Sequence, residues 1–472
     1  MIDRVFSRPP SPQPDHPQAT PGDRPVRSLR IELLLQATVV TLALAALSGC
    51  AIATTDVAKA AKPVSGFTIN GTVHGGQQPI SGAVIQLYAA SSNGYGASST
   101  PLLTSPVIST ANGSFSITGT YTCPSGSLVY LTATGGNPGL TPGTNNANLA
   151  MMAALGACSS LNATTNIQIN ELTTVGSVWP LARFMSGYGA LGSSPTNAAG
   201  LSAAFTAVNK VVNFGTGAVP GTTLPAGATL PTTEINTLAD ILATCINSAG
   251  GVAGDNTLCG QLFTAATAPG GTAPTDTVGA AINIARNPGN NLAALFNLSS
   301  PSAPFQPTLA TRPDNFLIGI NYIGGGLNAP KSVALDASGN VWAANSGNAS
   351  LTELSNNGTA LSPAGGFVGG GLNVPSSLAF DPSGNLWIAN QVGNSVSKFG
   401  ATGTPVSITA FTGGGLNAPS SISVDGSGNV WVTNAGNNSV TELNSVGTAV
   451  SPATGYTGAG LSTPAGIAVN PH

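Results

Sequence analysis

A seven-residue motif near the C-terminus decides the fold. Gly324-Gly-Gly-Leu-Asn-Ala-Pro330 returns as Gly369-Gly-Gly-Leu-Asn-Val-Pro375 and as Gly413-Gly-Gly-Leu-Asn-Ala-Pro419, and a looser copy is Gly458-Ala-Gly-Leu-Ser-Thr-Pro464. Successive copies begin 45, 44 and 45 residues apart. A fixed period of this length is typical of β-propeller blades, each of which is a small β-sheet of four strands. The sequence therefore predicts repeated β-sheets over residues 314–472.

A second motif lies inside each repeat. It reads Asp336-Ala-Ser-Gly-Asn-Val-Trp-Ala-Ala-Asn345, and its counterparts span 381–390 and 425–434. In such a hairpin the Asp side chain caps the turn and the Gly takes the left-handed conformation, while the Trp offers apolar surface for packing one blade on the next. We therefore expect structural roles for the Asp, Gly, Trp and Asn of each copy: Asp336, Gly339, Trp342, Asn345, Asp381, Gly384, Trp387, Asn390, Asp425, Gly428, Trp431 and Asn434.

Calcium binding by the three Asp residues is an alternative interpretation of the turns. One carboxylate per turn is too few for a hard cation that takes six or more oxygens. We therefore assign no metal and no cofactor.

These units resemble NHL repeats and the blades of streptogramin lyase-like propellers. The resemblance implies a propeller fold, and in the lyases His and Glu near the propeller axis act with a bound magnesium ion. Here the only His of the region is His472, and the only Glu are Glu353 and Glu442, which occupy equivalent positions in two repeats while Lys398 takes that position in the repeat between them. We therefore expect no lyase activity and name no catalytic residue.

The repeats predict three full blades and a partial one. Each blade is expected to hold four short strands, residues 316–323 to supply an outermost strand, and the residues after Pro464 one innermost strand. Three blades and these two pieces fall short of the usual four. Either the sequence is a truncated relative of a longer protein, or the arc is closed by a partner copy.

The N-terminus predicts export. Three Arg precede an apolar run from Ile31 to Leu47, and Leu47-Ser-Gly-Cys50 follows, which is the layout of a secretory signal. The last four residues resemble the lipobox of bacterial lipoproteins, in which the Cys is lipidated and becomes the N-terminus. We expect residues 1–49 to be the signal peptide, Cys50 the lipidation site, 50–63 a linker, and the outer membrane or cell surface the location. A single membrane-spanning anchor is the alternative.

The remaining cysteines agree with an exported protein. Cys123, Cys158, Cys245 and Cys259 are even in number, which in such a protein indicates disulfides. Of the three pairings, we favour Cys123–Cys158 and Cys245–Cys259 because each closes a local loop.

Two further domains precede the repeats. Short alternating segments between 64 and 140 predict a β-sandwich and resemble the carboxypeptidase regulatory-like (transthyretin-like) module, a non-catalytic unit, with His74 in a loop. Between 145 and 300 apolar residues recur at helical spacing, which predicts an all-α domain with Trp179 in its core. Glu171 and Glu234 could form an acid/base pair, but their places at helix starts favour a structural role.

Composition narrows the function. Of 472 residues only 29 are charged (13 basic and 16 acidic), and there are three His. Without a basic surface we exclude nucleic-acid partners. We expect a non-catalytic binding or scaffold protein, anchored to the membrane by lipid, that recognises a neutral polymer, a carbohydrate or a protein through polar loops. The alternatives are a propeller lyase or hydrolase and a purely structural envelope protein.

Overall fold

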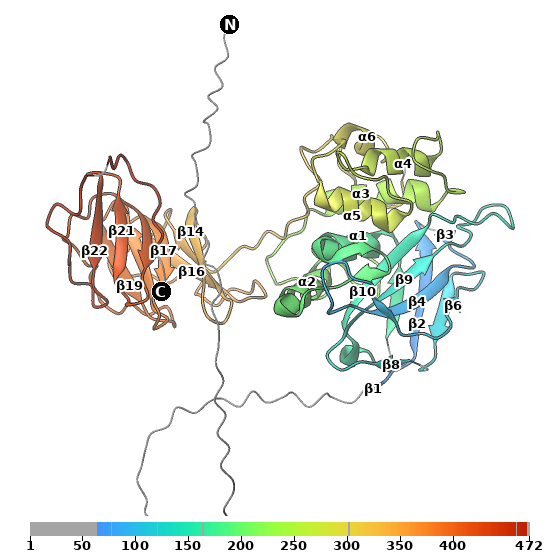
Figure 1. Ribbon diagram of the computed structural model, residues 1–472, viewed down its shortest axis with the longest axis horizontal. Coiled ribbons are helices and arrows are strands. Elements are labelled where there is room, and N and C mark those ends of the chain that lie inside the picture. Colours follow the sequence, from blue (N-terminus) through green and yellow to red (C-terminus); the bar gives the residue numbers. More distant parts are fainter. Residues whose placement is uncertain are drawn as a thin grey trace, which may run out of the picture. The chain divides into compact units, whose positions relative to one another are not determined.

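A computed structural model describes residues 64–76, 78–119, 121–162, 165–300, 303–458 and 460–469 (Figure 1). The predicted signal peptide, Cys50, His16 and His472 lie outside these ranges. No helix of the described part combines the length and the apolar composition that crossing a membrane needs.

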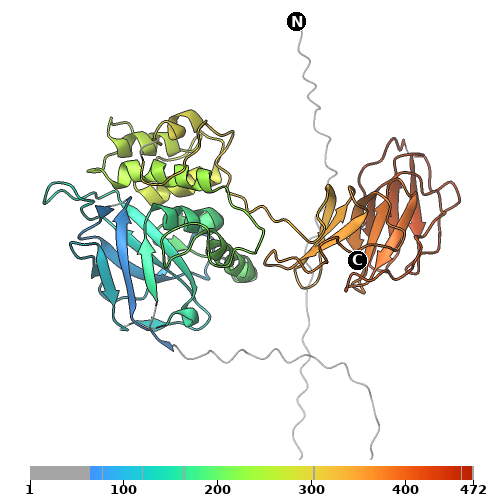
Figure 2. The same ribbon diagram turned by 180° about the vertical axis from the view of Figure 1, so that it is seen from behind.

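Two β-sheets open the described chain (Figure 2). One has the strand order β10-β9-β4-β5, with β6 also pairing with β4, and the other has the order β11-β2-β3, with β7 pairing with β2. A short separate pair joins β1 to β8. The strands are β1 Val64–Ser65, β2 Ile69–Gly75, β3 Gln78–Pro79, β4 Val84–Ala89, β5 Thr100–Pro101, β6 Val107–Ile108, β7 Ser114–Ile117, β8 Thr122–Cys123, β9 Leu128–Thr134, β10 Ala150–Ala157 and β11 Asn166–Ile169.

The prediction that residues 145–300 form helices alone is wrong at its start. β10 pairs antiparallel with β9, and β11 pairs parallel with β2, so both sheets extend past residue 145. β10 is the edge of its sheet, and hydroxyls from the helices bond its free N–H groups: Thr174 Oγ1 accepts from Met152 N at 3.1 Å and Ser177 Oγ from Ala154 N at 3.0 Å. Satisfying an exposed edge in this way ties helix to sheet.

Within the described residues, six α-helices follow the sheets in the sequence. They are α1 Glu171–Leu181, α2 Ala198–Val211, α3 Thr232–Ile246, α4 Leu258–Ala266, α5 Thr277–Arg286 and α6 Leu292–Phe296. Between α1 and α2 lie the short strands β12 Met185–Gly187 and β13 Ala190–Leu191. Asn170 caps α1 and Asp276 caps α5, where its Oδ1 accepts from Gly279 N at 2.8 Å.

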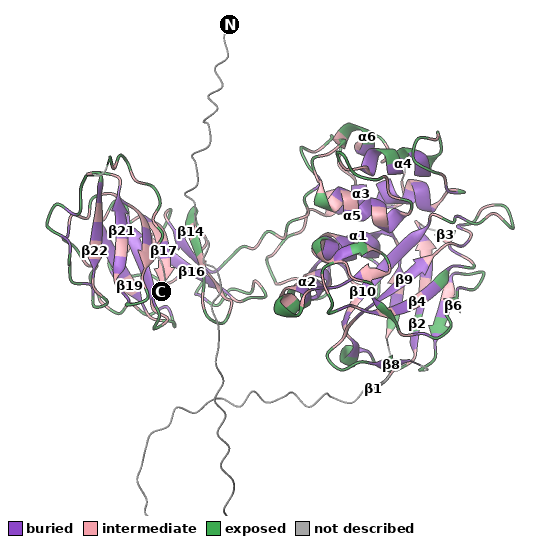
Figure 3. Ribbon diagram, in the orientation of Figure 1, coloured by how far each residue is buried: buried purple, intermediate pink, exposed green. Residues whose placement is uncertain are grey.

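Sheets and helices share one hydrophobic core. A single cluster of buried residues includes Ile85 of β4, Met151 of β10, Val175 of α1 and Leu238 of α3 (Figure 3). The boundary expected between residues 140 and 145 therefore does not separate two cores.

The repeats form three antiparallel sheets of three strands, which we call blades 1 to 3. Blade 1 holds β14 Pro330–Leu335, β15 Val341–Asn345 and β16 Ser350–Leu354; blade 2 holds β17 Pro375–Phe380, β18 Leu386–Asn390 and β19 Ser395–Phe399; blade 3 holds β20 Pro419–Val424, β21 Val430–Asn434 and β22 Ser439–Leu443. One buried cluster joins blades 1 and 2 and another joins blades 2 and 3, so the sheets stack face to face.

The expected fourth strand of each blade is reduced to two isolated bridges to the third strand. Phe367 pairs with Leu351, Phe411 with Val396, and Tyr456 with Val440, while Ala360, Pro405 and Ala449 pair with Leu354, Phe399 and Leu443. Residues 316–323 and 465–469, which were expected to be strands, form none. The described chain therefore shows three stacked blades and no closed barrel.

Candidate functional site

The turn between the first two strands of each blade is held by its Asp side chain, as the sequence predicts. In blade 2, Asp381 Oδ1 accepts from Ser383 N at 3.0 Å and from Asn385 N at 2.8 Å. Gly384 closes the turn with a φ of 79°. Burial acts to raise the pKa of Asp381, but the hydrogen bonds from Asn385 and Trp387, with the nearby Lys398, outweigh it and lower the pKa below its ordinary value.

Asp336 and Asp425 do the same in blades 1 and 3. Each Oδ1 accepts the backbone N–H of the residues two and four positions later. Hydrogen bonds likewise lower the pKa of both carboxyls against the opposing effect of burial. Gly339 and Gly428 have φ of 78° and 83°.

The Trp of each blade connects this turn to the next blade. Trp342 is fully buried in the cluster that contains Leu378 of blade 2, and Trp387 is fully buried among residues that include Ile422 of blade 3. Trp431 of blade 3 is only half-buried. The sequence assigned this packing role to all three indoles, and the first two fulfil it within the described chain.

The Asn at the end of each middle strand is buried and fully bonded. Asn390 Nδ2 donates to Ser395 Oγ at 3.2 Å and to Ser397 Oγ at 2.9 Å, while its Oδ1 accepts from Asn373 N at 3.1 Å. Asn345 and Asn434 make the equivalent bonds. This residue therefore links the hairpin to the Gly-Gly-Gly-Leu-Asn loop, which explains why it recurs.

The same third-strand position holds Glu353 in blade 1, Lys398 in blade 2 and Glu442 in blade 3, and each side chain contacts neighbouring residues. In blade 1 Glu353 Oε1 accepts from Asn340 Nδ2 at 3.1 Å, and in blade 3 Glu442 Oε2 accepts from the Tyr456 hydroxyl at 2.8 Å. In blade 2 Lys398 Nζ lies 3.3 Å from Asp381 Oδ2 and 4.4 Å from the Trp387 ring centre. Lys398 Nζ also donates to Ser445 O, in blade 3, at 3.0 Å, so only the two Glu contacts stay within one blade.

The blade residues described above do not come together in a catalytic or metal-binding cluster. Within the described ranges no set of three His, Cys, Asp or Glu lies close enough to hold a metal ion. The carboxylates of Asp336, Asp381 and Asp425 each hold a separate turn. A hollow of about 320 Å³ lies between the turns of blades 2 and 3, where Asp381, Lys398, Ser427 and Ser445 line it.

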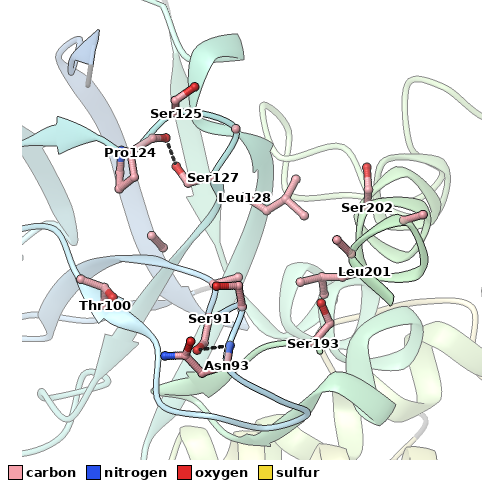
Figure 4. A pocket seen from close by; sticks show the side chains of 16 residues that line it. Ser91, Asn93, Thr100, Pro124, Ser125, Ser127, Leu128, Ser193, Leu201 and Ser202 are labelled. Atoms are coloured by element: carbon pink, nitrogen blue, oxygen red, sulfur yellow. Dashed lines mark hydrogen bonds between the residues drawn. The ribbon is translucent and has the colours of Figure 1, made fainter. Parts of the chain in front are cut away.

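A second hollow, which no sequence pattern indicates, lies in the first part of the chain (Figure 4). It measures about 590 Å³, and loops after β4, before β9 and before α2 form it together with the start of α2. Its lining combines apolar groups such as Leu128 and Leu201 with many hydroxyls, and none of the lining residues is charged. Short loops remote in sequence supply these hydroxyls, so only the folded chain shows them together.

Glu171 and Glu234 do not form the pair considered from the sequence. Glu171 is fully buried, and both its carboxylate oxygens accept from Gly76 N, at 2.9 and 3.0 Å. Burial raises its pKa to about 8, and the charge of Asp240, not of Glu234, adds to the rise. The neighbouring carboxylate therefore comes from the middle of α3, where helical periodicity alone did not single it out.

Asp240 is itself buried. Its Oδ1 accepts from Phe305 N at 3.1 Å, while Oδ2 has no hydrogen-bond partner among the described residues. Burial raises its pKa to about 7. Burial alone also raises the pKa of Glu234, to about 7. None of the hollows described above includes either member of the Glu171–Asp240 pair, so these acids belong to the protein interior.

Both expected disulfides are present. Cys123 is bonded to Cys158, and Cys245 to Cys259. His74 lies in β2 and not in a loop, and burial lowers its pKa. Trp179 is half-buried against the core, and its Nε1 donates to Phe316 O at 3.0 Å.

Comparison with known proteins gives no family. No family model matches the chain, and no curated protein matches it. Among solved structures, a streptogramin B lyase shares 19% identity over 25% of this chain and 38% of its own, with a TM-score of 0.20. A catalytically inactive virginiamycin B lyase from Staphylococcus aureus shares 16% over 28% and 44%, with a TM-score of 0.23.

Two other solved proteins match at the same level. A putative gluconolactonase shares 23% identity over 26% of this chain and 47% of its own, with a TM-score of 0.21. A calcium-binding regucalcin from Agrobacterium tumefaciens shares 18% over 26% and 43%, with a TM-score of 0.20. The chain spans less than half the length of each of these proteins. Its weak structural neighbours are thus propeller proteins of the lyase, gluconolactonase and regucalcin types, at low coverage.

Proposed function

We propose that the protein is a non-catalytic binding protein of the bacterial cell envelope, exported and anchored through a lipid on Cys50. Its blades present turns and loops to a neutral ligand, a carbohydrate or another uncharged polymer. The anchor and the location rest on the sequence between Arg24 and Cys50.

The observation that carries the proposal is how the blades use their polar side chains. The carboxylate oxygens of each turn Asp accept hydrogen bonds from backbone N–H groups and from the indole of its own blade. Each middle-strand Asn donates through its side-chain nitrogen and accepts through its side-chain oxygen. A carboxylate that holds its turn in this way cannot leave it to move a proton without breaking the turn. What the blades offer to a ligand is therefore Ser, Thr, Asn and backbone groups on the turns.

Neutrality of the ligand follows from the hollow between blades 2 and 3. Its two charged lining residues, Lys398 and Asp381, are already paired with each other at 3.3 Å. A charged ligand would give up its hydration without gaining an opposite charge, which costs free energy. A neutral ligand that exchanges hydrogen bonds avoids that cost.

The experiment is a binding screen of the full chain against immobilised neutral and acidic glycans. We expect binding to neutral glycans that changes little between low and high salt, because charge steering contributes little. Ser427→Trp would obstruct the hollow between blades 2 and 3 and should weaken binding, while Ser338→Trp, at the same position in blade 1, is the matched control.

The other outcomes contradict the proposal in different ways. If only Ala199→Trp, which fills the hollow of Figure 4, abolished binding, the ligand would bind in that hollow and not on the blades. Ala203→Trp, at a residue outside that lining, is the control. Binding only to acidic glycans, or turnover of a bound glycan, would overturn the assignment. A native protein whose mass shows no lipid on Cys50 would contradict the lipid anchor.

A further inference from the structure

The inner strand of blade 1 exposes an apolar face that the other two blades bury. Val333 and Leu335 of β14 are 66% and 65% exposed. The residues at the position of Val333 in blades 2 and 3, Leu378 and Ile422, are 6% and 5% exposed. The three strands have the same length and the same pairing, so the difference lies in what covers them.

The cover in blades 2 and 3 is the preceding blade. Trp342 lies in one cluster with Leu378, and it stands 6.2 Å, edge to face, from the ring of Phe380. Trp387 lies in one cluster with Ile422, and Val424 packs against that cluster. The chain thus builds the same interface twice: an indole of one blade against two apolar residues on the inner strand of the next.

On blade 3, the face that carries the indole of Trp431 is incompletely covered. Trp431 and Val440 are half-buried, whereas Trp387 and Val396, their counterparts in blade 2, are fully buried. Tyr456, whose ring stacks at 6.2 Å on that of Trp431, is 39% exposed. Residues 460–469 lie beside β20, where Ser420 donates to Pro464 O, and still leave this face partly open.

We propose that a second copy of this chain binds here, with the Val333–Leu335 face of one molecule packed on the Trp431–Tyr456 face of the other. The two faces are the two halves of an interface that the chain already forms between its own blades. Their charges also differ in sign, since Lys331 lies in β14 and Glu442 in β22. This inference goes beyond the proposed ligand binding and does not depend on it.

The contact is heterologous, because different surfaces meet. The stacked blades of two copies can then contact each other at both ends and close a ring, or successive copies can join end to end. A closed ring removes two exposed apolar residues of β14 from water in every copy, and an open array does so in all copies but one. Burial of such residues favours association.

The test is sedimentation velocity on residues 51–472, which lack the predicted signal peptide and Cys50, so that neither acyl chains nor the apolar run 31–47 drives association. We expect a mass of at least two chains at tens of micromolar and a monomer after Val333→Lys. Trp431→Ala and the milder Tyr456→Ala should each weaken association at the other face. Val392→Lys, at a 61% exposed apolar residue away from both faces, is the matched control and should associate as the parent does.

Mixing separates this contact from any symmetric one. A Val333→Lys molecule keeps an intact Trp431 face, and a Tyr456→Ala molecule keeps an intact β14 face. An equimolar mixture of these two variants should therefore form more dimer than either variant forms alone. A monomeric parent chain at all concentrations, a Val333→Lys variant that associates like the parent, or a mixture that stays monomeric would overturn the proposal.

Discussion

The indole Nε1 of Trp387 donates a hydrogen bond to Oδ2 of Asp381 at 3.0 Å, so the residue that caps the turn also fixes the ring that separates two blades. The same bond joins Trp342 to Asp336 at 3.3 Å and Trp431 to Asp425 at 3.1 Å. One carboxylate therefore supports both the local hairpin and the stacking of blades. This double role explains the fixed spacing of Asp and Trp in each repeat.

Asp381→Ala should destabilise the blades strongly. The change removes the acceptor of the Trp387 indole and of two backbone N–H groups, and it leaves Lys398 without its carboxylate. Hydrogen bonds to a charged group are worth about 1.5–3 kcal/mol, so we expect a loss of at least about 2 kcal/mol in the free energy of unfolding. Urea denaturation measures it, and Asp314→Ala, at an exposed site, should stay within about 0.5 kcal/mol of the parent.

Two glycines with similar φ should respond differently to alanine. Gly384 has a φ of 79° and nothing within 4 Å of an added Cβ, so Gly384→Ala carries the backbone cost alone, about 1–2 kcal/mol. Gly415 has a φ of 86°, and its added Cβ would lie 2.2 Å from Gly455 N, so the neighbouring backbone must move. Thermal denaturation should show the larger loss for Gly415→Ala, and equal losses would argue against the close approach of these loops.

The buried acids make stability depend on pH. The folded pKa of Glu171 is about 8 and that of Asp240 about 7, both above their ordinary values. The folded chain therefore binds more protons than the unfolded chain between about pH 4 and 8, and the free energy of unfolding falls as pH rises through that window. Urea denaturation at pH 5, 7 and 9 checks the direction.

Glu171→Gln is the control for this pH dependence. A glutamine keeps an acceptor for Gly76 N and cannot ionise. The variant should lose part of the decline between pH 5 and 9. A parent protein whose stability rises over the same range would contradict the buried, uncompensated acids.

The two disulfides should contribute unequally. They close loops of 35 and 14 residues, for which chain entropy gives about 4 and 3 kcal/mol. Replacing Cys123 and Cys158 by Ser should thus lower the free energy of unfolding by about 1 kcal/mol more than replacing Cys245 and Cys259. A larger loss for the shorter loop would show that contacts in the folded protein outweigh chain entropy.

The repeated residues allowed the blades to be predicted from the sequence. The domain boundary near residues 140–145 could not be predicted, because it depends on contacts between residues far apart in the chain. The Asp, Gly, Trp and Asn positions are local to each hairpin, so their roles could be inferred from one repeat. β10 was missed because its run of small and apolar residues suits a strand or a buried helix, and because its edge is satisfied by hydroxyls of helices more than twenty residues away. The fourth strands were overestimated, since each is reduced to two isolated bridges, at Ala360 and Phe367, at Pro405 and Phe411, and at Ala449 and Tyr456.

The candidate site shows the same limit. Glu171 stood out at a helix start, but its neighbour Asp240 comes from another helix, and sequence spacing could not bring the two together. Val333 has the same place in its repeat as Leu378 and Ile422, so its exposure depends on stacking that no single repeat encodes.

Hydrogen exchange of the indole N–H groups tests the stacking of blades most directly. In protein labelled with ¹⁵N at tryptophan, Trp342 and Trp387 should exchange slowly with deuterium, because both rings are fully buried and bonded to Asp. Trp431, half-buried, should exchange faster in the monomeric Val333→Lys variant, in which no second copy covers its face. Three indoles that all exchange at the rate of a solvated ring would contradict the account.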